Sequence, residues 1–433
     1  MTNKLTFLQL LKRNRNYRNT WIGQIVSEIG DHFNTIAVFS LALHNTNSGL
    51  IVSGIMIARA LPVVLAGPLA GVLLDRMDRK HLMIASDLAR AVVGLCFVFA
   101  IDPERTWLLF VLSFLLMFAS PFFTSGRAAI LPTITTDEEL HTANSLTKTT
   151  QWTAVTIGAM LGGATAMKFG YGWAFVFNAA SFVFSALCIA RLQAPRGFKA
   201  ARRALTESGV LRPWQEYVDG LRYMRSVPLL FSIALVHVGW ASGGGAAQIL
   251  FTLFGEVVYP YGPAGMGAIW GCAGVGLLIG GGYANRVGDG LQFDKYKRLI
   301  TIVFWIHGLS YIAFSQTRPF WLVLVFIAMS RSGMGVAAIL NMTLLLRHVP
   351  DEFRGRVFAT IETLTWGTMM LSMAVTGWAT EHYDARAIGT VAGVMSCSTA
   401  VVWMAAGWKG MLVEPDRVGV GREEVEVHGE PEI

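Results

Sequence analysis

Long apolar runs alternate with short charged segments along almost the whole chain. A helix needs about 20 mostly apolar residues to cross the hydrocarbon core of a bilayer, and most of the runs reach that length. The pattern therefore predicts an all-α polytopic membrane protein with about twelve transmembrane helices. The predicted spans are 21–43, 49–74, 82–101, 107–125, 142–167 and 173–192 in the first half of the chain, and 229–254, 265–285, 299–314, 320–345, 357–380 and 387–408 in the second.

Three segments lie outside these runs. Residues 1–20 are a basic N-terminus, and residues 193–228 are a basic linker in which a short helix is predicted near 214–223. Residues 411–433 are an acidic tail without an apolar period, which predicts a segment without ordered structure. These segments delimit an N-terminal bundle at 21–192 and a C-terminal bundle at 229–410.

Composition and charge agree with a membrane protein. Of the 433 residues, 53% are hydrophobic and 15% are charged, whereas a soluble domain carries about 25% charged residues. The net charge of +7 comes mainly from basic residues in short loops, so it does not indicate nucleic-acid binding. The sequence contains no metal-ligand spacing, nucleotide loop or hydrolase motif, which predicts no metal, no cofactor and no enzyme activity.

The distribution of basic residues predicts the orientation in the bilayer. If the N-terminus is cytoplasmic, the outward loops hold only Arg105, Lys168, Arg318 and Arg386. Lys and Arg are enriched in cytoplasmic loops of membrane proteins. We therefore expect a multi-pass protein of the plasma (cytoplasmic) membrane with both termini cytoplasmic.

Residues 67–80 form a charged corner, where an apolar glycine-rich run meets five charges within six residues. Gly71 is small enough to let a neighbouring helix approach closely. Asp75 ends the span, and Arg76 and Arg79 hold this end on the cytoplasmic side. The corner either only sets the topology or takes part in a gate.

Two short patterns of the first half recur in the second half, at offsets close to half the chain length. Such a recurrence indicates two pseudo-symmetric six-helix bundles. The second copy of the corner has lost its acid, so the first copy is expected to form the stronger contact. The recurring residues are Gly71, Asp75 and Arg76 with Gly281, Asn285 and Arg286, and Asp137-Glu138 with Asp351-Glu352.

The pattern Gly-x-x-x-Asp-Arg-x-x-Arg-Lys at 71–80 resembles the loop between the second and third helices of the major facilitator superfamily. The resemblance extends over 21–408 and is strongest to the exporter branch that includes macrolide and enterobactin efflux proteins. Asp78 stands where the family usually has Gly, and Ala159 stands where the fifth span of family antiporters commonly has Pro. Further matches are Ser27-x-x-Gly30-Asp31, Ala143-Asn144-Ser145-Leu146 and Arg354-Gly355-Arg356-Val357.

Glu28 and Asp31 are the strongest candidates for proton or substrate handling. A charge at bilayer depth costs at least about 2.5–3.5 kcal/mol, so it usually faces a partner or water. These two carboxylates lie three residues apart on one helix face, which Asn34 and Thr35 extend as a polar stripe. Two acids so close in a low dielectric should not both ionise easily. The alternative is a permanent pair between a buried acid and an arginine.

The available cations are Arg59 in the second predicted span, Arg127 after the fourth and Arg331 in the tenth. Arg127 lies near the cytoplasmic end, so its charge can also reach the interface. Asp87 and Arg90 lie three residues apart on the third span and are expected to neutralise each other.

In the second half, Glu362 either lines a central cavity or caps the inner gate. His237 and His307 are lone histidines on apolar spans, for which a satisfied core position is the expected environment. The following side chains either line an apolar drug cavity or only pack the bundle: Trp240, Trp270, Trp366, Met369 and Met370.

The resemblance implies a secondary transporter whose two bundles rock around a central site. We expect proton-coupled export of an amphipathic small molecule, a drug or a siderophore, by a monomer. The alternatives are a lysolipid or glycolipid flippase and a proton-coupled nutrient importer. The residues expected to bind protons or substrate are Asp31, Glu28, Asn34, Arg59 and Glu362, and those expected to form a gate are Gly71, Asp75, Arg76, Arg79, Arg354 and Arg356.

Overall fold

The computed structural model describes residues 6–193, 213–288 and 290–414, and its regular structure over those residues is helical. Most of the predicted linker and tail therefore lies outside the described residues. The first bundle comprises α2 (Arg15–Thr46), α3 (Gly49–Arg76), α4 (Arg79–Cys96), α5 (Trp107–Ile134), α6 (Asp137–Phe169) and α7 (Tyr171–Ala190). The second comprises α9 (Pro228–Leu253), α10 (Gly262–Val287), α11 (Phe293–Gln316), α12 (Phe320–His348), α13 (Asp351–Ala379) and α14 (Ala385–Trp408). Two short turns, η1 (Phe97–Ile101) and η3 (Phe254–Val258), extend α4 and α9, and η2 (Pro103–Arg105) lies before α5.

Each predicted span corresponds to one long helix, so the all-helical membrane fold is confirmed. Several helices begin before the apolar run, because their first turns are polar and capped. Thr136, for example, caps α6 through a capping box with Glu139 and starts the helix before the predicted position. The predicted short linker helix is also present, as α8 (Pro213–Ser226), and a further short helix, α1 (Phe7–Arg13), precedes α2.

Nine segments of the described chain are long and apolar enough to cross a membrane by themselves. The three long helices that fall short of this criterion are α2, α6 and α13. All three lie against the other bundle: α6 packs on α10, α13 packs on α3, and α2 touches α9 and α10. A helix enclosed by other helices can carry polar side chains that a lipid-facing helix cannot.

The internal repeat has a structural counterpart in both bundles. Asp137 and Asp351 each begin a helix, α6 and α13, and the repeated arginines Arg76 and Arg286 lie in the last turns of α3 and α10. The duplicated sequence therefore marks equivalent helix ends, which confirms the two pseudo-symmetric six-helix bundles.

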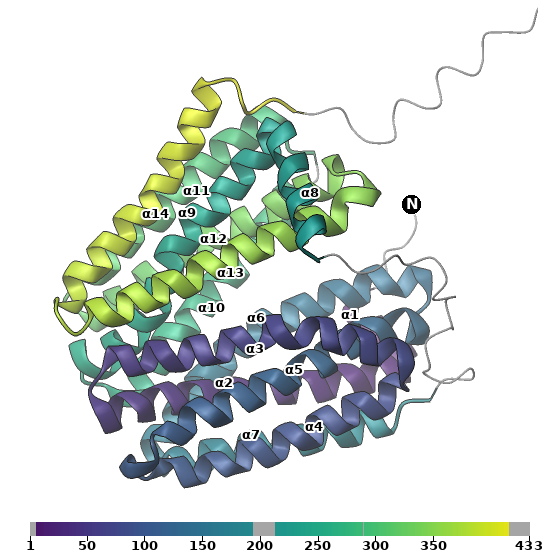
Figure 1. The fold of residues 1–433 in the computed structure, drawn as a ribbon, viewed down its shortest axis with the longest axis vertical. Helices are drawn as coiled ribbons and strands as arrows, with labels where there is room; N and C mark the ends of the chain where they lie inside the picture. The colour runs from purple at the N-terminus through teal and green to yellow at the C-terminus, as the bar shows by residue number, and fades with distance from the viewer. Residues whose placement is uncertain (1–5, 194–212, 289, 415–433) are drawn as a thin grey trace, which may run out of the picture.

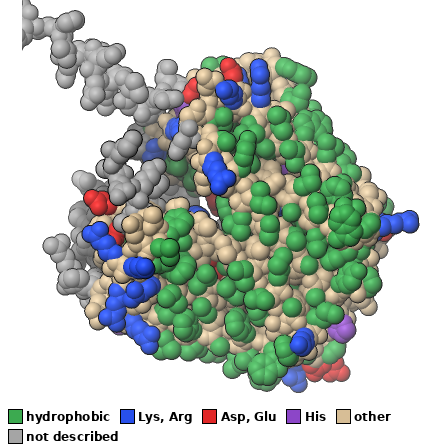
Figure 2. All heavy atoms as spheres, turned by 180° about the vertical axis from the view of Figure 1, so that it is seen from behind, with side chains coloured by type: hydrophobic (Ala, Val, Ile, Leu, Met, Phe, Trp, Pro, Cys, Tyr) green, Lys and Arg blue, Asp and Glu red, His purple; other side chains and the backbone are tan. Residues whose placement is uncertain are grey.

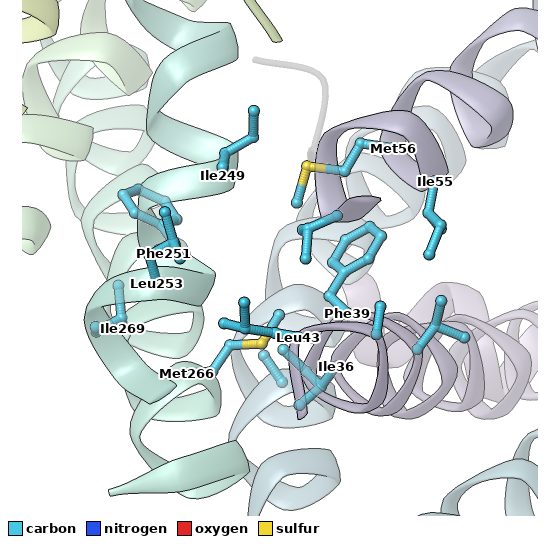
Figure 3. Close-up of a cluster of buried hydrophobic side chains, with 14 of the residues drawn as sticks. Ile36, Phe39, Leu43, Ile55, Met56, Ile249, Phe251, Leu253, Met266 and Ile269 are labelled. Atoms are coloured by element: carbon cyan, nitrogen blue, oxygen red, sulfur yellow. The ribbon is translucent and has the colours of Figure 1, made fainter. Parts of the chain in front are cut away.

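The two bundles meet at one end of the molecule and separate at the other (Figure 1). We call the end where α2 begins the basic end and the opposite end the far end. At the far end one hydrophobic cluster contains residues of both bundles. Figure 3 shows Ile36 and Phe39 of α2 and Met56 of α3 opposite Ile249 and Met266 of the second bundle. Toward the basic end each bundle has its own separate core.

Close packing of α6 on α10 joins the bundles near the far end. A Cβ atom at Gly163 would collide with the Pro263 carbonyl oxygen, and a Cβ atom at Gly267 would collide with the Ala159 carbonyl oxygen. Glycine at both positions lets the two backbones approach to contact distance. Ala159 is itself 1% exposed, so a small residue serves this contact where the family commonly has Pro.

Polar contacts add to the closure at the far end. The Ser48 hydroxyl donates to Glu381 Oε1 at 2.8 Å, and the Ser53 hydroxyl donates to the Met373 carbonyl at 2.8 Å. The Ser40 hydroxyl contacts Glu256 in the same region. Each contact crosses between bundles, so this conformation is closed at the far end, whereas the helices of the two bundles diverge toward the basic end (Figure 1).

Hydrophobic side chains cover most of the face drawn in Figure 2, and the charged groups gather toward its margins. A broad apolar belt between charged margins is the surface that a lipid bilayer requires.

Candidate transport site

A buried ionic cluster occupies the interior of the N-terminal bundle. The Arg90 side chain of α4 is 3% exposed and makes a direct contact with Asp87, one turn earlier on the same helix. Its Nη1 atom lies 3.9 Å from Asp31 Oδ2 of α2. The guanidinium also lies over the Phe182 ring, 4.4 Å from its centroid. The predicted Asp87–Arg90 pair is therefore present. Asp31 lies beside this pair, so the cluster has three charged side chains.

Asp31 is the loosely held carboxylate of this cluster. Asp87 is fully buried, whereas the Asp31 side chain is 27% exposed. Asp31 Oδ1 has no hydrogen-bond partner among the described residues. The cation nearest to Asp31 is Arg90. Because Arg90 also contacts Asp87, the two carboxylates share one positive charge. Asp31 therefore combines access to the interior space with weak neutralisation by the protein.

Glu28 has hydrogen-bond partners of its own, one on α2 and one on α5. Glu28 Oε1 accepts hydrogen bonds from Gln24 Nε2 at 2.9 Å and from Arg127 Nη1 at 3.3 Å. Arg127 of α5 is thus paired within the bundle, and no extension toward the interface is required to explain its position. The two acids of α2 share a face, as predicted, but a different arginine lies next to each.

Arg59 of α3 joins the polar stripe of α2. Its Nη1 donates to Asn34 Oδ1 at 3.0 Å and its Nη2 donates to Thr35 Oγ1 at 3.0 Å. No described carboxylate lies within 4.0 Å of Arg59, so neutral oxygens solvate its charge. The structure therefore brings Asn34 and Arg59 together, as two members of the predicted site.

A cavity of about 460 Å³ lies along the C-terminal bundle. Its volume falls within the ~300–1,000 Å³ that is usual for small-molecule sites. Most of its wall is apolar or aromatic, and its residues come from α6, α9, α10, α12 and α13. Of the side chains considered either as cavity lining or as core packing, Trp240, Trp270, Trp366 and Met369 contribute to this wall, whereas Met370 is not part of it.

Glu362 also lines this cavity, which is one of the two positions considered for it. His237 lies in the same wall, and its Nδ1 is 2.8 Å from the Ile233 carbonyl of its own helix. His307 is buried and lies between α11 and α12, with Nδ1 2.8 Å from the Ser330 hydroxyl. His307 therefore has the core environment expected of it, whereas His237 is half-buried in the cavity wall.

Three of the predicted gate residues, Arg79, Arg354 and Arg356, have contacts within their own bundles in this conformation. Arg79 donates to the Ala129 carbonyl at 2.9 Å, and Arg354 donates to the Leu346 carbonyl at 3.0 Å. Arg356 lies over the Phe353 ring, and Arg76 is exposed.

The close approach expected at Gly71 is absent from this conformation, since no described atom lies within 4 Å of a Cβ placed there. The cause is the separation of the bundles at the basic end. The Asp75 side chain lies outside the described residues. Asp78, the departure from the family pattern, caps α4 by accepting from the backbone of Lys80 and His81.

Comparison with known proteins identifies the family. The family model described as Major Facilitator Superfamily matches residues 20–365, which is most of the chain. The chain belongs to the Major Facilitator Superfamily. This facilitator is 25% identical to the uncharacterized MFS-type transporter YfiS of Bacillus subtilis, over 81% of this chain and 83% of the relative. It is 23% identical to macrolide efflux protein A of Streptococcus pyogenes, over 82% of this chain and 86% of the relative.

The solved structure of the nucleoside transporter NupG has the same fold as this facilitator. The TM-score is 0.70 at 13% identity, over 90% of this chain and 99% of that chain. Membership of the family confirms the predicted class, a multi-pass membrane transporter of small molecules and not an enzyme.

Sequence reasoning missed the acids that close the far end of this facilitator. Glu256 and Glu381 both cross to hydroxyl groups of the N-terminal bundle. Each acid lies at the end of an apolar run. Acids are common at such positions, so the sequence does not distinguish these two as contacts between the bundles. Their pairing with Ser40 and Ser48 depends on tertiary structure.

Proposed function

We propose that this facilitator exports an amphipathic small molecule in exchange for protons, by alternating access. The observation that carries the proposal is Asp31, a partly accessible carboxylate inside the N-terminal bundle that shares its arginine with a second acid. A group that takes and releases protons must be reachable and must not be locked in a permanent pair. Asp31 meets both conditions, whereas Asp87 is fully buried against Arg90.

The conformation fits alternating access. We infer from the positive-inside rule that the basic end faces the cytoplasm and that both termini are cytoplasmic. The bundles would then diverge on the cytoplasmic side, where an exporter loads its cargo and an importer releases it. The name of the similar macrolide efflux protein supports export as the direction.

Asp31 is proposed to carry the proton, with Glu28 tuning it or contacting a cationic part of the substrate. Asn34 and Arg59 would hold the polar stripe in place beside it. Glu362 is proposed as a substrate contact, because it lines the aromatic cavity of the other bundle.

Transport by proteoliposomes of fixed orientation tests this proposal. Wild-type protein should concentrate a fluorescent amphipathic dye or a macrolide against its gradient only when a proton gradient is imposed. Asp31→Asn should abolish this accumulation, because the residue can no longer exchange a proton. It should spare downhill exchange of labelled for unlabelled substrate, which requires no net proton movement.

The matched control is Asp294→Asn, which removes an exposed acid from the first turn of α11. This variant should accumulate substrate like the wild type. Accumulation by Asp31→Asn at the wild-type level would refute the assignment. A wild-type protein that accumulates substrate equally well without a proton gradient would refute proton coupling itself.

A further inference from the structure

Arg331 is a buried cation with no partner acid among the described residues. It lies near the middle of α12, is 7% exposed and lines the cavity of the C-terminal bundle. Its Nη1 contacts the Met334 sulfur at 3.2 Å, and its guanidinium lies 5.0 Å from the centroid of the Phe251 ring. No carboxylate oxygen of the described residues lies within 4.0 Å of it.

These contacts are weak compensation for a charge at membrane depth. A thioether sulfur is a poor acceptor, and the ring attracts the cation without accepting its N–H groups in a directed hydrogen bond. Intramembrane arginines usually pair with an acid or a backbone carbonyl, or face a water-filled space. Arg331 therefore presents uncompensated positive charge to the cavity that it lines.

The rest of the wall supplies aromatic surface. The indole Nε1 atoms of Trp240 and Trp270 are buried and have no hydrogen-bond partner among the described residues. Both tryptophans line the same cavity. Their rings and Phe251 form an apolar surface suited to the body of an amphipathic molecule.

Among the described residues that line the cavity, Glu362 is the acid. Its side chain is more exposed than that of Arg331. Glu362 is exposed, so water can solvate its charge without a ligand. Arg331 is buried, and its charge has no such solvation by bulk water. The buried side chain is the positive one, and water already solvates the negative one. We therefore expect the cavity to bind an anionic group more tightly than a cationic group.

We propose that this cavity binds an amphipathic oxyanion. A carboxylate, sulfonate or phosphate group would pair with Arg331, and the apolar body would lie against Trp240, Trp270 and Phe251. The planar guanidinium can give two parallel hydrogen bonds to such a group. This inference rests on the proposed function and specifies the substrate class for the same transport cycle.

Three dansyl probes of matched size test the charge preference. N-dansyl-6-aminohexanoate is anionic, N-dansylhexylamine is neutral and dansylcadaverine is cationic. Their binding to protein in nanodiscs is measured by energy transfer from tryptophan, with empty nanodiscs as the blank. Wild-type protein should bind the anionic probe about ten- to a hundred-fold more tightly than the neutral one, as a charge-assisted hydrogen bond provides.

Arg331→Met should remove this preference and leave the neutral probe within about twofold of wild type. Arg331→Lys should retain most of it, because the charge remains. Arg347→Gln is the matched control, since Arg347 is exposed near the end of the same helix, and it should bind all three probes like wild type. Equal binding of the anionic and neutral probes by wild type overturns the inference, even if the variants fail to fold. An undiminished preference in Arg331→Met overturns it as well.

A competition arm identifies the source of the oxyanion. Displacement of the anionic probe by lysophosphatidylglycerol, and not by octanoate, assigns the site to a lipid headgroup. Displacement by octanoate assigns it to a water-soluble carboxylate, and displacement by neither compound overturns the oxyanion site. The binding measurements use no ion gradient, so a missing charge preference together with intact proton-driven export refutes this inference and leaves the proposed function standing.

Discussion

The buried arginines of the N-terminal bundle lie against oxygen atoms, whereas the contacts of Arg331 in the C-terminal bundle are with a sulfur atom and an aromatic ring. Arg90 contacts Asp87, Arg127 binds Glu28, and Arg59 donates to Asn34 and Thr35. In the C-terminal bundle, Arg331 lies beside the Met334 sulfur and the Phe251 ring, and His307 and Tyr311 are close enough to interact with its charge. The two bundles share one helical plan, so this difference lies in the side chains of their interiors.

The difference indicates a division of labour between the duplicated halves. A network of acids shared among arginines can change its protonation at a small cost, because the positive charges remain to stabilise each state. An aromatic cavity with one uncompensated charge instead offers binding energy to an outside molecule. We therefore infer that coupling resides in the first bundle and most of the substrate affinity in the second.

Removal of the two buried arginines gives the largest expected contrast. Arg90→Met leaves Asp87 buried without a cation and should destabilise the protein by about 3–5 kcal/mol. Arg331→Met leaves no described acid without a partner and should keep or raise the thermal stability. The measurement is thermal unfolding in detergent, followed by size-exclusion chromatography.

The double variant Arg90→Met/Asp87→Asn supplies the control for this comparison. It removes both charges of the pair and should recover much of the lost stability, because no isolated charge remains. Equal destabilisation by Arg90→Met and Arg331→Met would mean that Arg331 has a structural partner, and the contrast between the bundles would fail.

The sequence predicted the helices well for a physical reason. A bilayer requires long apolar runs and charged ends, so each span is visible in the pattern. The Asp87–Arg90 pair was also predictable, because its members lie one helical turn apart. Arg127 and Glu28 are 99 positions apart, so only the packing of α5 on α2 could reveal their contact. The predicted gate contacts depend on the conformation, which a helix pattern does not contain.

Glu28→Gln should have a smaller effect than the loss of an arginine. The amide can still accept from Gln24 and Arg127, but the charge opposite Arg127 is lost. We expect a change in substrate affinity of about three- to tenfold with proton-driven accumulation retained. Affinities from transport at several substrate concentrations measure this effect, and Glu104→Gln, an exposed loop acid, is the control. Complete loss of accumulation would instead assign the coupling role to Glu28.

The charged corner offers the subtlest test of the asymmetry between the bundles. The first corner has Asp75 where the second has Asn285, so Asp75→Asn makes the two alike at this position. We predict that Asp75 and Arg76 form a closing contact at the basic end with Arg354 and Arg356 of the other bundle. An ion pair near the surface contributes at most about 1 kcal/mol, so its loss should shift the balance of open and closed states up to about fivefold.

Labelling of a cysteine in the cavity measures this shift. Ala338→Cys, in a background without the four native cysteines, places a thiol in the cavity wall. Asp75→Asn should raise its rate of reaction with an impermeant reagent added at the basic end, because the open state gains population. Asn285→Asp is the reciprocal variant, and it should lower that rate if an acid at this corner favours closure in either bundle. Unchanged rates in both variants would leave the corner with a role in topology alone, and the first bundle would then differ from the second only in its interior.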